Sequence, residues 1–130
     1  MSDFLVDATS RTPKIELNAQ AGTLLLAGES YPEDVTQFYG TLNENLDAYF
    51  ATSPTALTVS IKLTYFNSSS ARALMELMDR LDGAASDGIT VTIDWYCDPE
   101  DDITQEFAED IGADITNATL TLHDLDRDDA

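Results

Sequence analysis

Two stretches of strict alternation constrain this chain more than any other feature of its sequence. Every second residue is large and apolar over 57–65 and again over 89–95: Leu57, Val59, Ile61, Leu63 and Tyr65, then Ile89, Val91, Ile93 and Trp95. The residues between them are mainly threonine, serine, lysine and aspartate. A strand that is buried on both faces is apolar throughout, so these two strands belong to a sheet that is covered on one face only.

The segments around these strands give the order of the elements. Residues 14–18 and 23–28 predict a hairpin joined by the turn AQAG, and residues 119–122 predict a short last strand. Apolar residues recur at helical spacing within 35–50, 71–81 and 103–111. The predicted order is ββαβαβαβ, a mixed five-stranded sheet that is antiparallel in the hairpin and parallel beyond it. With three helices mainly on one face, the predicted fold class is a two-layer α/β domain.

Several signals place the helices more closely. The stretch SYPE, Ser30–Glu33, has the form of a capping box, with its serine as the N-cap and Pro32 in the first helical turn. In the second helix Met75 joins the inward stripe, and Gly83 marks the end. In the third helix Ile103 is expected to face inward.

The length of 130 residues suits one domain with a single core. We expect a flexible N-terminal arm over 1–13, one domain over 14–123 and an acidic tail over 124–130.

Acids outnumber Lys and Arg by 25 to 6, and a net charge of -19 argues against nucleic acid and anionic membranes as partners. The chain has no membrane-length apolar run, no signal-peptide pattern and only one cysteine, which together favour the cytoplasm.

Three polar segments fall at the predicted carboxyl ends of the parallel strands. They are ESYPE (Glu29–Glu33), NSSS (Asn67–Ser70) and WYCDPEDD (Trp95–Asp102). Parallel α/β sheets gather ligand and regulatory sites at this edge. The aromatic residues of the first and third segments could form a docking surface, since such residues are enriched at interfaces, or could equally belong to the core.

Three motifs, GESYPED, YFNSSSARAL and ITVTIDWYCDPEDD, resemble in order and spacing the SiaC family of bacterial biofilm-regulation phosphoproteins. The similarity runs from about Ile15 to Leu122. The family resembles the STAS domains of anti-sigma factor antagonists, which agrees with the predicted architecture. The resemblance implies a signalling switch without cofactor or enzymatic activity. In this family a protein kinase phosphorylates one hydroxyl, a metal-dependent phosphatase removes the phosphate, and the unmodified form binds and activates a diguanylate cyclase, which controls c-di-GMP and biofilm formation.

The same resemblance implies roles for individual residues. The family's YFN-Thr-Ser-Ser motif corresponds to residues 65–70, so Ser68 matches the phosphoacceptor, with serine in place of threonine and the hydroxyl retained. Ser69 and Ser70 are alternates, because a kinase could select a neighbour. The predicted partner-binding residues are Glu29, Tyr31, Pro32, Glu33, Asn67, Ser68, Ser69, Trp95 and Tyr96.

The residues alone leave two interpretations of the serine run open. Asn and Ser are preferred N-cap residues, so the run could simply begin a helix. Alternatively, a phosphate on Ser68 would gain hydrogen bonds from the free N–H groups of the first turn and would add about 1.5–2 negative charges. Such a phosphate would block a partner contact and leave the fold intact.

The acidic cluster Asp98–Asp102 suggests an alternative function, a small metal- or ligand-binding protein or hydrolase. Four carboxylates follow the ligand spacing of an EF-hand loop: Asp98, Glu100, Asp102 and Glu109. However, Ile103 stands where that loop requires glycine, and acids are also favoured at helix starts by the helix dipole. We therefore predict no metal site. Cys97 and His123, the only thiol and imidazole, lie in no motif for nucleophilic catalysis.

Overall fold

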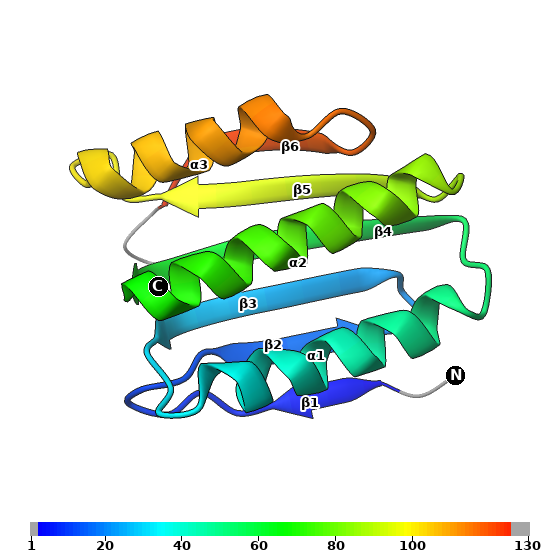
Figure 1. Cartoon of the computed structure of the whole chain (residues 1–130), viewed down its shortest axis with the longest axis horizontal. Coiled ribbons are helices and arrows are strands. Elements are labelled where there is room, and N and C mark those ends of the chain that lie inside the picture. The colour runs from blue at the N-terminus through cyan, green and yellow to red at the C-terminus, as the bar shows by residue number, and fades with distance from the viewer. Residues whose placement is uncertain (1–2, 126–130) are drawn as a thin grey trace.

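The computed structural model describes residues 3–125, which form one sheet with a layer of helices against it (Figure 1). The strands are β1 (Phe4–Val6), β2 (Lys14–Asn18), β3 (Thr23–Ser30), β4 (Ala56–Phe66), β5 (Thr90–Cys97) and β6 (Thr119–Asp124). The helices are α1 (Val35–Phe50), α2 (Ser68–Ser86) and α3 (Asp102–Asp114). Over residues 3–125, none of the helices combines the length and the apolar character that a membrane crossing requires.

The strands lie in the sheet in the order in which they occur in the chain, β1-β2-β3-β4-β5-β6. The pairings of β2 with β1 and with β3 are antiparallel, and the pairings from β3 to β6 are parallel. Each helix therefore connects two neighbouring parallel strands, and Figure 1 shows the helices on the same face of the sheet. The predicted two-layer α/β architecture is confirmed.

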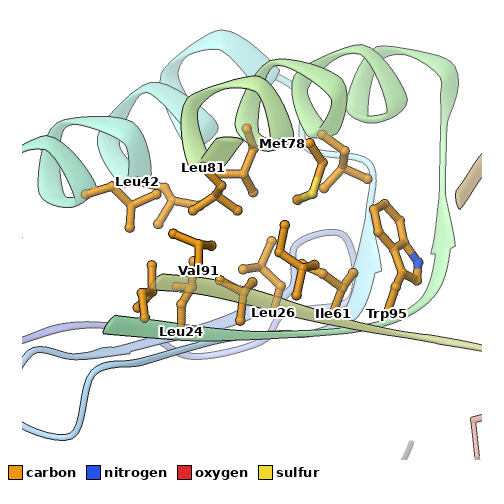
Figure 2. Close-up of a cluster of buried hydrophobic side chains, with 14 of the residues drawn as sticks. Leu24, Leu26, Leu42, Ile61, Met78, Leu81, Val91 and Trp95 are labelled. Atoms are coloured by element: carbon orange, nitrogen blue, oxygen red, sulfur yellow. The ribbon is translucent and has the colours of Figure 1, made fainter. Parts of the chain in front are cut away.

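The core fills the space between the helices and the sheet. Figure 2 shows part of it: Leu24, Leu26, Ile61, Val91 and Trp95 from the strands, and Leu42, Met78 and Leu81 from the helices. Each of these side chains is at most 3% exposed. Burial of one Val, Leu, Ile or Met side chain stabilises a fold by about 1.5–3 kcal/mol. The opposite face of the sheet carries the polar residues of the alternating segments, and no helix of residues 3–125 covers it.

The sheet has six strands where five were predicted. The additional strand, β1, lies within residues 1–13, the segment expected to be a flexible arm. Its residues pair antiparallel with β2, Phe4 opposite Leu17 and Val6 opposite Ile15. A strand of 3 residues is too short to show a period in the sequence, so its partner strand defines it. At the other end, Leu125 is buried, and residues 126–130 of the predicted acidic tail lie outside the described residues.

The start of α1 differs from the predicted capping box. Ser30 is the last residue of β3, and the N-cap of α1 is Asp34, whose carboxylate accepts a hydrogen bond from the Gln37 N–H at 3.0 Å. Pro32 therefore lies before the helix, outside its first turn. Because Ser and Asp are both strong N-caps, two candidates four residues apart could not be separated by sequence alone.

α2 departs from its predicted pattern in two places. It continues past Gly83 and ends before Gly88, whose φ of 107° is a left-handed conformation of the kind that stops helices. Within the helix Met75 is exposed and Leu77 is buried, so the inward face is rotated relative to the predicted stripe. A spacing of three or four residues fits more than one stripe along a long helix, which explains the misplacement of Met75.

Asp82 joins α2 to the segment before β6. Its carboxylate accepts hydrogen bonds from the N–H groups of Asn117 and Ala118, both at 2.8 Å, and from Thr116. These bonds, the one from Ala118 first, hold the pKa of Asp82 below its ordinary value. The folded state thus favours the ionised carboxylate.

We expect Asp82→Ala to lower the free energy of unfolding by about 1–2 kcal/mol at pH 7, because charged hydrogen bonds are lost at a site that solvent partly screens. Since the folded pKa is depressed, this stability is present above the unfolded pKa near 4 and is lost as the pH falls through the folded pKa. Urea denaturation at pH 7 and at about pH 2 measures it. Asp79→Ala, at an exposed position on the same helix, is the control, and an undiminished difference at the acid pH would contradict the assignment.

Candidate functional site

The serine run begins α2 directly after β4. The N-cap is Asn67, whose Oδ1 accepts a hydrogen bond from the Ser70 N–H at 2.9 Å. The Asn67 N–H donates to the carbonyl oxygen of Ser30 at 3.2 Å, which holds this junction against the end of β3. The capping interpretation is therefore confirmed for Asn67, and the serine hydroxyls are not needed as the cap.

The three serines differ in their access to solvent. Ser68 and Ser69 are exposed, whereas Ser70 is completely buried. The Oγ of Ser70 accepts a hydrogen bond from the Oγ of Ser30 at 2.9 Å. A kinase has to reach the hydroxyl that it modifies, so the structure removes Ser70 from the alternates and leaves Ser68 and Ser69.

A buried chain of hydroxyl groups, the hydroxyl triad of Tyr39, Ser30 and Ser70, anchors the first turn of α2. The Tyr39 hydroxyl lies 2.6 Å from the Ser30 Oγ. Because Ser30 uses its one proton on Ser70, the Tyr39 hydroxyl is the donor to Ser30. Burial raises the pKa of Tyr39 to about 12, so this donor keeps its proton at physiological pH. The start of α2 is thereby fixed to both β3 and α1.

An apolar groove lies beside Ser68, between the β4–α2 junction and the start of α3. This α2–α3 groove holds about 440 Å³, and the residues that line it include Tyr65, Phe66, Ser68, Asp101, Ile103 and Phe107. Tyr65 is 53% exposed and Ile103 is 82% exposed, and both line this groove, so their exposed apolar surface is gathered in one place. Phe66 and Phe107 pack against each other, with ring centroids 5.2 Å apart. The exposed Ser68 thus lines the edge of this apolar groove.

Tyr65 and Ile103 were both predicted to face inward, and both exceptions have a local cause. The β3–β4 register shifts so that Glu29 pairs with Tyr65, which leaves Thr64 without a partner in the ladder. An extra residue of this kind turns the following side chain to the other face of the strand. Ile103 is the second residue of α3, before the part of the helix that is buried. The groove was therefore missed, and an isoleucine directly after the acidic run is the only hint of it in the sequence.

The segment after β3 packs against the same edge. The rings of Tyr31 and Tyr65 meet edge to face, with centroids 5.8 Å apart, and the Tyr31 hydroxyl donates to the Ser10 carbonyl oxygen at 2.7 Å. The Arg11 guanidinium lies 5.7 Å from the Tyr31 ring centroid and pairs with Glu33 at 2.8 Å. Four predicted partner-binding residues share this edge: Glu29, Tyr31, Pro32 and Glu33.

Trp95 and Tyr96, the other two aromatic candidates, lie on opposite faces of the sheet and do not form one docking surface. Trp95 is 0% exposed and packs edge to face with Phe107, so its side chain belongs to the core and is not available for docking. Tyr96 points to the face without helices, where it stacks on His123 at 4.8 Å and lies beneath the Lys62 ammonium at 4.9 Å. Alternation along β5 sends neighbours to opposite faces, and this separates the two.

The acidic segment before α3 serves local structure. Asp101 is the N-cap of α3 and accepts hydrogen bonds from the hydroxyl and the N–H of Thr104, at 2.6 and 3.0 Å, which lower its pKa. Asp98 accepts a hydrogen bond from the Glu100 N–H at 2.9 Å. Since 102–114 is helical, the second half of the EF-hand-like spacing is not a loop. In residues 3–125 no three or more His, Cys, Asp or Glu side chains gather as a metal ion would require.

The thiol and the imidazole lie on opposite faces of the sheet. Cys97 is buried, and burial, followed by the charges of Asp101 and Asp124, raises its pKa to about 11. The thiol therefore stays protonated at neutral pH. On the other face, His123 Nε2 lies 2.9 Å from Asp94 Oδ1. This arrangement does not provide a Cys–His nucleophile.

Comparisons with known proteins agree with the fold. Residues 6–125 match the family described as SiaC family regulatory phosphoprotein. An uncharacterized protein of Pseudomonas aeruginosa strain UCBPP-PA14 is 32% identical over 116 residues, which cover 89% of this chain and 92% of that protein.

Two solved structures from Pseudomonas aeruginosa are also similar. Apo-SiaC superposes with a TM-score of 0.87 at 30% identity, covering 95% of this chain and 99% of that chain. A chain from the crystal structure of diguanylate cyclase SiaD in complex with its activator SiaC superposes with a TM-score of 0.84 at 30% identity, covering 93% of this chain and 100% of that chain. The family match spans nearly all of the described residues, and this chain therefore belongs to the SiaC family of regulatory phosphoproteins.

Proposed function

We propose that this chain is a phosphorylation-switched activator of a diguanylate cyclase, and that Ser68 carries the phosphate. The unmodified form binds and activates the cyclase, which controls c-di-GMP and biofilm formation. The observation that carries the proposal is the exposed Ser68 hydroxyl at the lip of the α2–α3 groove. A similar chain, SiaC, is the activator of a diguanylate cyclase with which it forms a complex.

Position favours Ser68 over Ser69. Both are exposed, but Ser69 lies on the other side of α2, where it lines the surface between α1 and α2 together with Arg72. Only Ser68 borders the apolar groove. A phosphate on Ser68 adds about 1.5–2 negative charges at that lip. A partner that covers the groove would have to bury this charge, and the cost of doing so prevents docking.

The domain itself should tolerate the phosphate. The Ser68 side chain faces solvent, so its modification displaces no core residue. The positive end of the helix dipole also favours a negative group at the start of α2. Phosphorylation therefore acts on the contact and leaves the fold unchanged.

The chain acts as a substrate and a binding partner, without a catalytic function of its own. Its partners are a protein kinase, a metal-dependent phosphatase and the cyclase, and the setting in which they meet is the cytoplasm. The protonated Cys97 thiol and the local hydrogen bonds of Asp98 and Asp101 support this assignment.

The proposal is tested by phosphorylating the purified chain with the kinase of the same organism and ATP. Peptide mass spectrometry should locate one phosphate on Ser68, and Ser68→Ala should remain unmodified. The unmodified chain should raise the rate of GTP consumption by the full-length cyclase, and the phosphorylated chain should not. A phosphate found on another residue, or equal activation by both forms, would refute it.

A further inference from the structure

We infer that the α2–α3 groove receives one large apolar side chain of the cyclase, and that Lys or Arg residues of the cyclase flank this side chain on the α3 side. The inference rests on the proposed function and adds the chemistry of the partner segment. It is carried by the exposure of Ile103 and Tyr65, by the carboxylates on one side of the groove, and by the place of Ser68 on the other.

The apolar part of the inference comes from the groove itself. Ile103 projects into solvent with 82% of its surface exposed, so it contributes almost nothing to the core of this chain. Tyr65 is held in its exposed position by the edge-to-face contact with Tyr31. Phe66 and Phe107 complete a preformed apolar wall. An apolar side chain placed here would remove part of each of these surfaces from water, as the anchor residue of an interface hot spot does.

The basic part of the inference comes from charge complementarity. Asp101 lines the groove, and the exposed Glu100 and Asp102 lie beside it in the chain. Hydrogen bonds from Thr104 hold the pKa of Asp101 below its ordinary value, so this carboxylate is ionised at neutral pH. No lysine or arginine is among the residues that line the groove. An acidic partner would be repelled at this side and a basic one attracted.

The apolar contact and the basic contact together explain how a negatively charged phosphate can prevent the binding of a partner that carries basic residues. The carboxylates belong to α3 and to the segment before it, whereas Ser68 belongs to α2 and directly follows Phe66 and Asn67, which also line the groove. A phosphate there would have to lose its water against the apolar side chain of the partner. The cost of stripping water from a doubly charged group exceeds the small gain from attraction between exposed charges. The phosphate therefore blocks docking although it adds attraction at long range.

Calorimetric titration of the full-length cyclase of the same organism with the whole chain tests the inference. Ile103→Ala should weaken binding by about tenfold or more. Leu5→Ala, which shortens an exposed aliphatic residue on β1 at the opposite edge of the sheet (Figure 1), should leave the affinity unchanged. Glu100→Lys should weaken binding by about threefold to tenfold at low salt, and the effect should shrink as salt screens the charges. Thermal melting checks that each variant is folded.

The outcomes separate the inference from the proposed function. If Ile103→Ala binds like the wild type while phosphorylation of Ser68 abolishes binding, the groove assignment is overturned and the switch stands. If Glu100→Lys binds more tightly, the basic flank is wrong. Sedimentation that shows a dimer of the isolated chain, dissociated by Ile103→Ala, would assign the groove to a second copy and overturn the inference. If the unmodified wild type does not bind the cyclase at all, both proposals fail.

Discussion

Ser68→Asp should bind the cyclase about 10- to 100-fold more weakly than the wild type, and chain phosphorylated on Ser68 should bind more weakly still. The side chain of Ser68 borders the α2–α3 groove, so a carboxylate there has to be desolvated when the groove is covered. Burial of an uncompensated charge costs several kcal/mol, and each 1.4 kcal/mol corresponds to tenfold in affinity. Ser68→Ala should bind like the wild type, since it adds no charge and Asn67 provides the cap.

Ser69→Asp is the matched control for this prediction. It changes the net charge by the same amount at an exposed position one residue along, but it faces the surface between α1 and α2. Its affinity for the cyclase should stay within about threefold of the wild type, because exposed charges interact weakly. Titration calorimetry measures both variants, and their melting temperatures should match the wild type. Equal losses for Ser68→Asp and Ser69→Asp would mean that bulk charge, and not the groove, governs binding.

Trp95→Ala should lower the free energy of unfolding by about 3–5 kcal/mol, the range for truncation of a large buried aromatic residue. Trp95 is completely buried and packs edge to face with Phe107, so its removal opens a cavity beneath α3. Its indole nitrogen has no hydrogen-bond partner within residues 3–125, so almost the entire loss comes from packing. Urea denaturation followed by circular dichroism measures the change.

The neighbouring residue gives the contrast. Tyr96→Ala should cost only about 1 kcal/mol, because the ring lies on the open face and is held there by the Lys62 ammonium and the His123 ring. The pair of variants therefore tests whether helices cover one face of the sheet and not the other. Similar losses for both substitutions would contradict the one-sided core.

Periodicity in the sequence predicted the sheet because its physical cause is simple. Because one face of the sheet lies on the core and the other lies in water, apolar and polar residues have to alternate along β4 and β5. The helix that connects these two parallel strands, α2, has to pack on the apolar face. The same reasoning failed for β1, whose short length shows no period, and for Tyr65, which an irregular β3–β4 register turns outward. Local irregularities of this kind depend on the partner strand, which a sequence pattern does not contain.

The candidate site was predicted in part. The resemblance pointed to Ser68, and the strand order placed the segment of Tyr31 at the same edge. The groove was not predicted, because Ile103 fits a helical stripe in the sequence although it lies ahead of the buried part of α3. Trp95 and Tyr96 were grouped as neighbours in sequence, yet adjacent residues of a strand face opposite directions.

The hydroxyl triad has a consequence for how the proposed phosphorylation switch works. Buried hydrogen bonds among Tyr39, Ser30 and Ser70 tie the first turn of α2, next to Ser68, to β3 and α1. Under the proposed function, the modified and unmodified forms should therefore differ in the phosphate and not in the backbone around Ser68, and only cleavage of the phosphate ester should restore binding. Small changes in the stability of the domain should then have little effect on the proposed switch, and the rates of the kinase and the phosphatase should set how long the signal lasts.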